Sequence, residues 1–199
     1  MKMIELCALL HDVNDRKYVD KTRKDGNIDD IRKLLVGCGI SNDGIERIFN
    51  VCEYVSFSKE NKMKLKGGKE YEAYLKVFED NVELRIVSDA DRLDAIGAVG
   101  IARTFTFGGC FGRKMFNYIP DNNDCGINDD ECKESGNDVM NWIQNDNECK
   151  KTTLYHFYEK LFLLKDMMKT ESGKKLANKR HDIMKAYVDQ FLLEWNGDI

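Results

Sequence analysis

Proline occurs once in this chain of 199 residues, at Pro120, and this scarcity constrains the fold more than any other feature. Proline interrupts helices, so a chain that is almost free of it can run in long helical segments. Several segments carry apolar residues at helical spacing, and no segment shows the strict alternation that is typical of a half-buried strand. The sequence therefore predicts an all-α protein, a helical bundle in a single domain.

Capping residues indicate where the helices begin and end. Ser41 and Thr170 are natural N-caps, whereas Gly37 and Gly39 favour the end of a helix. Helices are expected at residues 3–12, from Asp29 to Gly37, after Ser41, and at 71–105, 152–168 and 171–195. Loops are expected in the polar segment 56–70 and the Gly-rich segment 107–120, and a polar surface excursion at about 118–150.

The composition excludes several classes of partner and location. A net charge of -4 argues against binding to a nucleic acid duplex or to an anionic membrane, and no apolar run is long enough to span a bilayer. Glu5 interrupts the apolar N-terminal run, so this run does not resemble a signal peptide. The seven cysteines are odd in number and none is spaced as C-x-x-C. We therefore expect reduced thiols and a cytoplasmic protein.

Two short acidic stretches are candidates for chemistry. His11 and Asp12 end an apolar run, and "SDADRLDAIG" places Asp91 and Asp94 at i and i+3 on one helix face beside small apolar residues. A solvated, charged helix turn is the simpler interpretation of such acids, but an acid among apolar neighbours is costly unless it is paired or binds a metal. A second His-Asp dipeptide, His181 and Asp182, falls in a basic amphipathic helix and is interpreted as surface.

The longer motifs resemble those of the HD superfamily of metal-dependent phosphohydrolases. "ALLHD" is followed by "SDADRLDAIGAVGIARTFTFGG" and then by "HFYEKLFLLKDMMKTESGKK" at 156–175. Together these motifs resemble a subgroup of small stand-alone HD hydrolases, and the resemblance extends over nearly the whole chain. It implies one HD phosphohydrolase domain over 1–199 that binds a divalent metal ion, either Mn, Mg, Fe or Zn.

Carried over residue by residue, the resemblance implies that His11, Asp12 and Asp91 are the metal ligands and the catalytic residues. Asp91 is chosen over Asp89 because "ADRL" is the element that other HD hydrolases share. The metal ion would polarise a phosphoryl oxygen and acidify a bound water. Asp12 would orient that water or take its proton.

Further residues are candidates for binding a phosphorylated substrate. Asp15 is either a support for the His11 ring or an ordinary helix-end acid, and the Gly-rich segment that carries Arg113 and Lys114 is either a phosphate clamp or a plain turn. Arg92 is instead expected to be the ion-pair partner of a nearby acid. The full set of candidate substrate-binding residues is Asp15, Lys17, Asp94, Arg103, Arg113, Lys114, His156 and Lys160.

The resemblance implies hydrolysis of a nucleotide, either of a phosphomonoester or of a nucleoside triphosphate to the monophosphate and pyrophosphate. The family's first metal-binding His has no counterpart in the ten residues before His11. Either the chain starts at an internal methionine of a longer product or it is natively short, and the uncovered core would then favour a homo-oligomer. The alternative function is a nucleotide-binding module without turnover. A di-iron oxygenase is set aside because the chain has three histidines.

Overall fold

The structure, a computed structural model, describes residues 2–13, 28–117 and 149–198. These residues form helices and short connections, and no strand occurs among them, so the predicted all-α helical bundle is confirmed. They cluster into two compact units, described here separately: Met1–Arg92 with Met168–Gly173, and Leu93–Met167 with Lys174–Ile199. The single domain over 1–199 stays a prediction.

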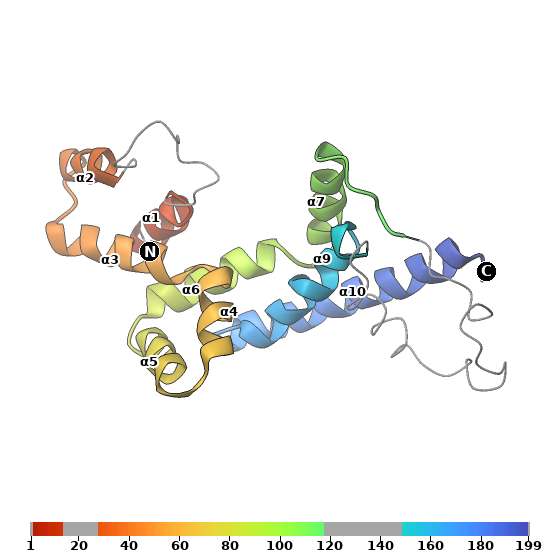
Figure 1. Cartoon of the computed structure of the whole chain (residues 1–199). Helices are drawn as coiled ribbons and strands as arrows, with labels where there is room; N and C mark the ends of the chain where they lie inside the picture. The colour runs from red at the N-terminus through yellow and green to blue at the C-terminus, as the bar shows by residue number, and fades with distance from the viewer. Residues whose placement is uncertain (1, 14–27, 118–148, 199) are drawn as a thin grey trace. The chain divides into compact units, whose positions relative to one another are not determined.

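The core of the first unit lies between its N-terminal helices. Helix α1 (Lys2–Leu10) lies beside α3 (Asn42–Tyr54), and α2 (Ile28–Gly37) contacts α3 as well (Figure 1). The predicted N-cap is confirmed, because the Ser41 hydroxyl accepts a hydrogen bond from the Gly44 amide at 3.2 Å. One apolar cluster joins α1, α2 and α3 to the later helices of this unit, through Cys7, Leu35, Ile45, Ile48, Val51, Cys52, Val55, Tyr74, Phe78, Leu84 and Val87.

The prediction of a loop at 56–70 is wrong, because this segment forms helix α4 (Phe57–Lys66) and the start of α5 (Gly68–Glu79). Ser56 caps α4 by accepting a hydrogen bond from the Lys59 amide. Gly67, with φ of 65°, separates the two helices, which lie side by side. The segment is polar because half of the residues of α4 are exposed, yet its Glu60 is buried.

The single helix expected at 71–105 is also wrong, since the chain breaks twice there. After α5 come α6 (Val82–Asp94) and α7 (Gly97–Cys110). The second break depends on two glycines, because Gly97 has φ of 78° and a Cβ on Gly100 would meet the Ala95 carbonyl oxygen at 2.2 Å. Main-chain atoms therefore approach closely at these small residues, at a sharp turn between two helices.

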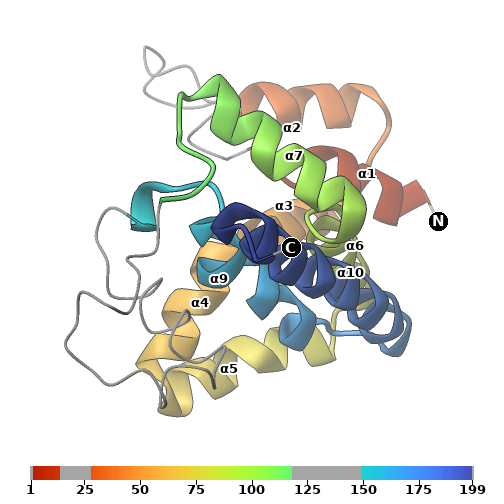
Figure 2. The same ribbon diagram turned by 90° about the vertical axis from the view of Figure 1, so that its right-hand side faces the viewer.

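Aromatic side chains build the second unit. Figure 2 shows α7, α9 (Tyr155–Glu159) and the C-terminal part of α10 (Glu171–Asn196) gathered together. The Phe105 ring of α7 lies within about 6 Å of three other rings, those of Phe157, Tyr187 and Phe191. These contacts fix α7 and α9 against α10.

Two sequence expectations for the second unit need correction. The helix expected at 152–168 is α9 followed by the 3-10 helix η3 (Leu161–Met167), and the short 3-10 helix η2 (Cys149–Lys151) precedes them. The loop expected at 107–120 begins later, because α7 continues to Cys110. Gly108 is helical there and lies against Thr153, whose hydroxyl would be 2.1 Å from an added Cβ.

The helix expected at 171–195 is confirmed as α10. Its predicted N-cap is confirmed too, because Thr170 Oγ1 accepts a hydrogen bond from the Gly173 amide at 2.9 Å. Among the helices described here, none is long and apolar enough to cross a membrane. Most of the polar excursion expected at about 118–150 lies outside the described residues.

Candidate metal centre

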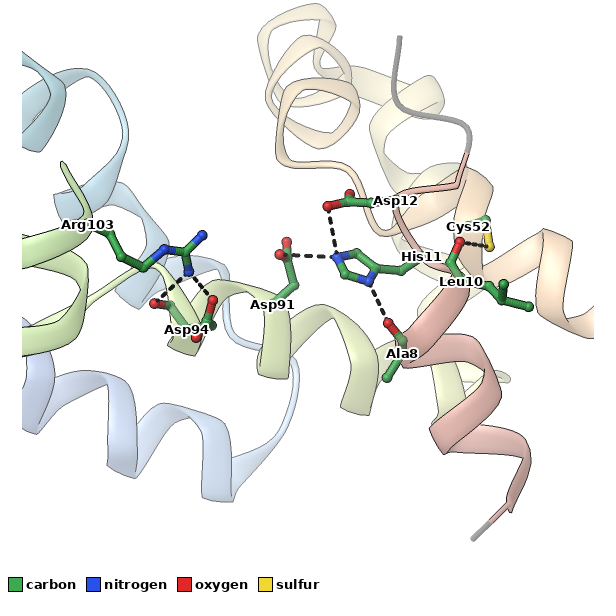
Figure 3. Close-up of polar contacts among 8 residues, drawn as sticks. All are labelled: Ala8, Leu10, His11, Asp12, Cys52, Asp91, Asp94 and Arg103. Carbon is green, nitrogen blue, oxygen red and sulfur yellow. Dashed lines mark hydrogen bonds and ion pairs between the residues drawn. The ribbon is translucent and has the colours of Figure 1, made fainter. Parts of the chain in front are cut away.

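His11 lies in the turn that follows the last residue of α1. Its Nδ1 donates a hydrogen bond to the Ala8 carbonyl at 2.7 Å, one helical turn earlier (Figure 3). A carbonyl oxygen is an acceptor alone, so the proton is on Nδ1. This contact orients the ring and leaves Nε2 as the nitrogen that faces away from the helix, as in many histidine metal ligands.

Two carboxylates approach Nε2 of His11, from segments far apart in the sequence. An oxygen of Asp12 lies 3.4 Å from Nε2, and an oxygen of Asp91 lies 3.5 Å from it. Asp91 is carried by α6, on the same helical stripe as Leu84 and Val87, which are buried in the core. That stripe aims Asp91 at His11, and the structure thus brings together all three residues that the sequence proposed as metal ligands.

The arrangement demands positive charge at Nε2. The pKa of His11 is raised to about 9, chiefly because the Asp91 carboxylate stabilises the protonated ring, with help from the Ala8 carbonyl and the charge of Asp12 and against the effect of burial. Two carboxylates facing a lone pair would repel it. A proton or a bound cation at Nε2 is therefore favoured over the neutral ring.

The chemistry of these donors fits a divalent metal ion. Within the described ranges no group of three or more His, Cys, Asp and Glu side chains is arranged as a ready-made metal site. One imidazole nitrogen with its other nitrogen tied to a carbonyl, and two carboxylates, are nevertheless ligands that Mn, Fe, Zn and Mg-type ions accept. The metal itself stays a proposal.

Asp94 does not share the contacts of Asp91, although the sequence placed both on one helix face. Arg103 binds the Asp94 carboxylate and also donates to its main-chain oxygen at 3.3 Å (Figure 3). Both side chains are exposed, at 67% for Asp94 and 60% for Arg103. An exposed arginine held by an acid can still turn a face to an anion, so their proposed role in substrate binding stays open to test.

The other candidate substrate-binding residues that the structure describes lie in the second unit. Arg113 is exposed and lies 5.7 Å from the centre of the Phe107 ring, and Lys114 is exposed beside it. His156 pairs with Glu159 at 2.7 Å. Helix α9 ends at Glu159, so Lys160 is its C-cap and not a further helical residue. Asp15 and Lys17 lie outside the described residues.

Sequence reasoning missed the buried neighbours of Asp91. Asp89 is 3% exposed and accepts hydrogen bonds from the Lys169 amide and from the amide and hydroxyl of Thr170. Glu60 is 1% exposed and binds Arg92 at 2.6 Å, which confirms Arg92 as an ion-pair partner. Nothing in the local sequence distinguishes Glu60 from a surface acid, because its partner lies 32 positions away.

The interpretation of His181 as a surface residue needs correction. The ring lies 5.3 Å from that of Phe162 in an edge-on contact, and burial lowers its pKa. His181 therefore belongs to the packing of the second unit. Asp182 beside it is exposed, as predicted, so the second His-Asp dipeptide has no arrangement like that of the first.

Comparison with known proteins assigns the family. No family model matches the chain. The chain is 31% identical to Bacillus subtilis YpgQ over 188 residues, covering 94% of this chain and 70% of YpgQ. The crystal structure of YpgQ in complex with ADP is 28% identical, with a TM-score of 0.62 over 96% of this chain and 74% of that one. An HD-superfamily hydrolase from Bacillus thuringiensis is 29% identical, with a TM-score of 0.59 over 98% and 73%. The chain therefore belongs to the HD superfamily, in the same family as Bacillus subtilis YpgQ.

Proposed function

We propose that this protein is a metal-dependent phosphohydrolase that cleaves a nucleotide at a centre formed by His11, Asp12 and Asp91. The observation that carries the proposal is the convergence of two carboxylates, one from α6, on Nε2 of His11 at 3.4 and 3.5 Å. Two carboxylates beside an imidazole nitrogen attract a cation by their negative charge. The fold and the HD-superfamily relatives agree with hydrolase chemistry.

Each of the three residues has a separate task. When bound, a divalent ion supplies Lewis acidity, which draws electrons from a phosphoryl oxygen and lowers the pKa of water. His11 presents Nε2 because its Nδ1 is held by Ala8, and Asp91 is held by the core stripe of α6. Asp12 is the most exposed of the three, at 59%, so its carboxylate is the one placed to accept a proton from the attacking water.

The substrate class rests on a relative. YpgQ has been crystallised with ADP, which supports a nucleotide as the substrate or product class for this chain. We infer cleavage of a nucleoside triphosphate to the monophosphate and pyrophosphate, with hydrolysis of a phosphomonoester as the competing reaction. Arg103 and Arg113 supply exposed guanidinium groups of the kind that bind phosphate in two-pronged fashion.

A nucleotide panel tests this function. The protein is incubated with Mn²⁺ and each of several nucleoside mono-, di- and triphosphates, and released phosphate and pyrophosphate are measured separately. Asp91→Asn is expected to abolish release, whereas Asp182→Asn, an exposed acid of the other His-Asp dipeptide, is expected to leave it unchanged. The proposal is contradicted if none of the nucleotides releases phosphate or pyrophosphate, or if Asp91→Asn releases as much as the unchanged protein.

A nucleotide-binding module is the second candidate. It is favoured by one observation: the described residues hold no ready-made group of three metal ligands. In that case ADP would raise the melting temperature of the protein by binding the folded state, without phosphate release under any metal. Stabilisation that is accompanied by turnover would exclude the module in favour of the enzyme.

A further inference from the structure

Four charged residues form a buried cluster beside Asp91 in the first unit: Glu60, Asp89, Arg92 and Lys169. Glu60 of α4 binds both Arg92 and the Lys169 ammonium, and the Lys169 ammonium also lies 4.8 Å from the centre of the Phe78 ring. Glu60 and Arg92 are each 1% exposed. Formal charges in the cluster balance, two negative and two positive, and burial lowers the pKa of Lys169 against the opposing effect of Glu60.

The position of this cluster on α6 is what links it to the candidate metal centre. Asp89 and Arg92 are three residues apart and share the side of α6 that faces the cluster, while Asp91 lies between them in sequence and points to His11. A residue of a helix is displaced by about 100° from its neighbour, so the rotation of α6 about its axis fixes the directions of all three side chains at once.

We propose that Glu60 is a positioning residue for the candidate metal ligand Asp91, acting through Arg92; the proposal rests on the metal-dependent function proposed above. Glu60 is an acid that binds Arg92, and Arg92 is joined to Asp91 by one peptide bond. Holding the Arg92 side chain in the buried cluster fixes the rotation of α6 about its axis, so that Asp91, about 100° away around the helix, stays directed at His11. Sequence motifs did not identify Glu60, because it lies in the polar segment 56–70.

A buried ion pair also contributes to folding, so the two roles must be separated. Replacing Glu60 by Gln removes one negative charge and leaves two buried cations with a neutral partner, which both destabilises the unit and releases Arg92. Replacing both members, Glu60→Gln with Arg92→Met, also removes the guanidinium that has lost its Glu60 carboxylate, and is expected to recover part of the stability. The double variant still lacks the link that orients Asp91.

The test combines Mn²⁺ binding with nuclear magnetic resonance of ¹⁵N-labelled histidine in the metal-free protein. The chain has three histidines, and His156 and His181 belong to the second unit, so they are internal controls for the His11 signal. Glu60→Gln is expected to weaken Mn²⁺ binding by about tenfold to a hundredfold, as loss of groups that orient metal ligands commonly does. It is also expected to shift the His11 ring signals while those of His156 and His181 stay unchanged.

The double variant decides between positioning and stability. It is expected to melt at a higher temperature than Glu60→Gln while its Mn²⁺ affinity stays low. Recovery of Mn²⁺ affinity together with stability, or an unchanged His11 signal in Glu60→Gln, overturns the proposal. If Glu60→Gln does not fold, Glu60→Asp, which keeps the charge on a shorter side chain, must show the same His11 shift, and an unchanged spectrum overturns the proposal. His11→Ala separates the two hypotheses: Mn²⁺ binding that survives this change contradicts the metal centre itself.

Discussion

Thr170 donates two hydrogen bonds to a single carboxylate oxygen of Asp89, although 81 positions separate the two residues. The main-chain amide lies 2.8 Å from this oxygen and the hydroxyl 2.7 Å, while the Lys169 amide donates to the other oxygen at 2.7 Å. A buried acid of α6 therefore satisfies the main-chain donors that precede α10. The same hydroxyl accepts a hydrogen bond from the Gly173 amide, so Thr170 caps the start of α10 while Asp89 accepts the hydrogen bonds that Thr170 donates.

Thr170→Val is expected to lower the free energy of unfolding by about 1–3 kcal/mol. Valine keeps the shape of the side chain but loses the hydroxyl, which leaves one oxygen of buried Asp89 with a donor fewer and removes the cap of α10. Urea denaturation followed by circular dichroism measures the change. Thr106→Val, on the exposed side of α7, is the matched control and is expected to change stability by less than about 0.5 kcal/mol.

Gly173→Ala is expected to destabilise the protein, contrary to the usual effect of alanine in a helix. An added Cβ would lie 2.2 Å from Asp89 Oδ2, so the carboxylate must move away from its three donors. A loss of about 1–3 kcal/mol is expected from such overpacking. Ser172→Ala, one residue earlier and exposed, supplies the control. A more stable Gly173→Ala protein would mean that Asp89 has room that the structure does not show.

Asp91→Asn is expected to weaken Mn²⁺ binding by at least about a hundredfold, since the amide keeps the size of the ligand but removes its charge. Asp94→Asn is the comparison within the same helix, because Asp94 binds Arg103 and not His11. It is expected to leave Mn²⁺ affinity within about twofold of the unchanged protein. Calorimetric titration of both variants measures the effect, and equal affinities in the two would contradict the assignment of Asp91.

The metal-free protein is expected to lose stability as the pH rises from about 6.5 to about 9. The pKa of His11 is about 9 in the folded protein and near 6.5 in an unfolded chain, so the protonated ring stabilises the fold fully below pH 6.5. This contribution is lost as the pH passes through 9, and solvent around Asp12 and Asp91 limits it to roughly 2 kcal/mol. Unfolding curves across this range measure it, and His11→Gln is expected to remove the slope.

Metal affinity is expected to change with pH in the opposite sense. A metal ion must displace the proton that the raised pKa of His11 retains, so Mn²⁺ binding should strengthen by about tenfold per pH unit until the pH reaches about 9. Titrations of the same protein at a series of pH values test this dependence. A flat profile between pH 6 and 8 would show that His11 is not a ligand.

Local signals in the sequence predicted those parts of the fold that depend on neighbouring residues. The sequence predicts Ser41 and Thr170 as caps because a serine or threonine hydroxyl just before a helix commonly accepts a hydrogen bond from an amide of its first turn. The breaks between α5, α6 and α7 were missed because the helical spacing of apolar residues continues across them. The segment 56–70 was taken as a loop because Glu60, which is buried against Arg92, cannot be told from a solvent-exposed acid by its neighbours in the sequence.

In the candidate site, too, the residues could be predicted from local motifs, whereas several of their contacts could not. His11, Asp12 and Asp91 were named from short motifs, and the structure brings these three together. Contacts between different helical segments were not foreseen: Asp94 is held by Arg103, and the His181 ring packs on Phe162. A motif marks which residues can do chemistry, whereas several of the contacts that hold them come from other helical segments, which the motif does not reveal.

The four residues "DADR" at 89–92 therefore make contacts of three different kinds. Asp89 completes the start of α10, Arg92 neutralises a hidden acid, and Asp91 alone faces His11. Under the proposed function, a homologue that had lost hydrolysis would still keep the stabilising contacts of the first and last of these residues. A genome search that scores this motif would then accept such an inactive descendant, and the residue to inspect would be the third.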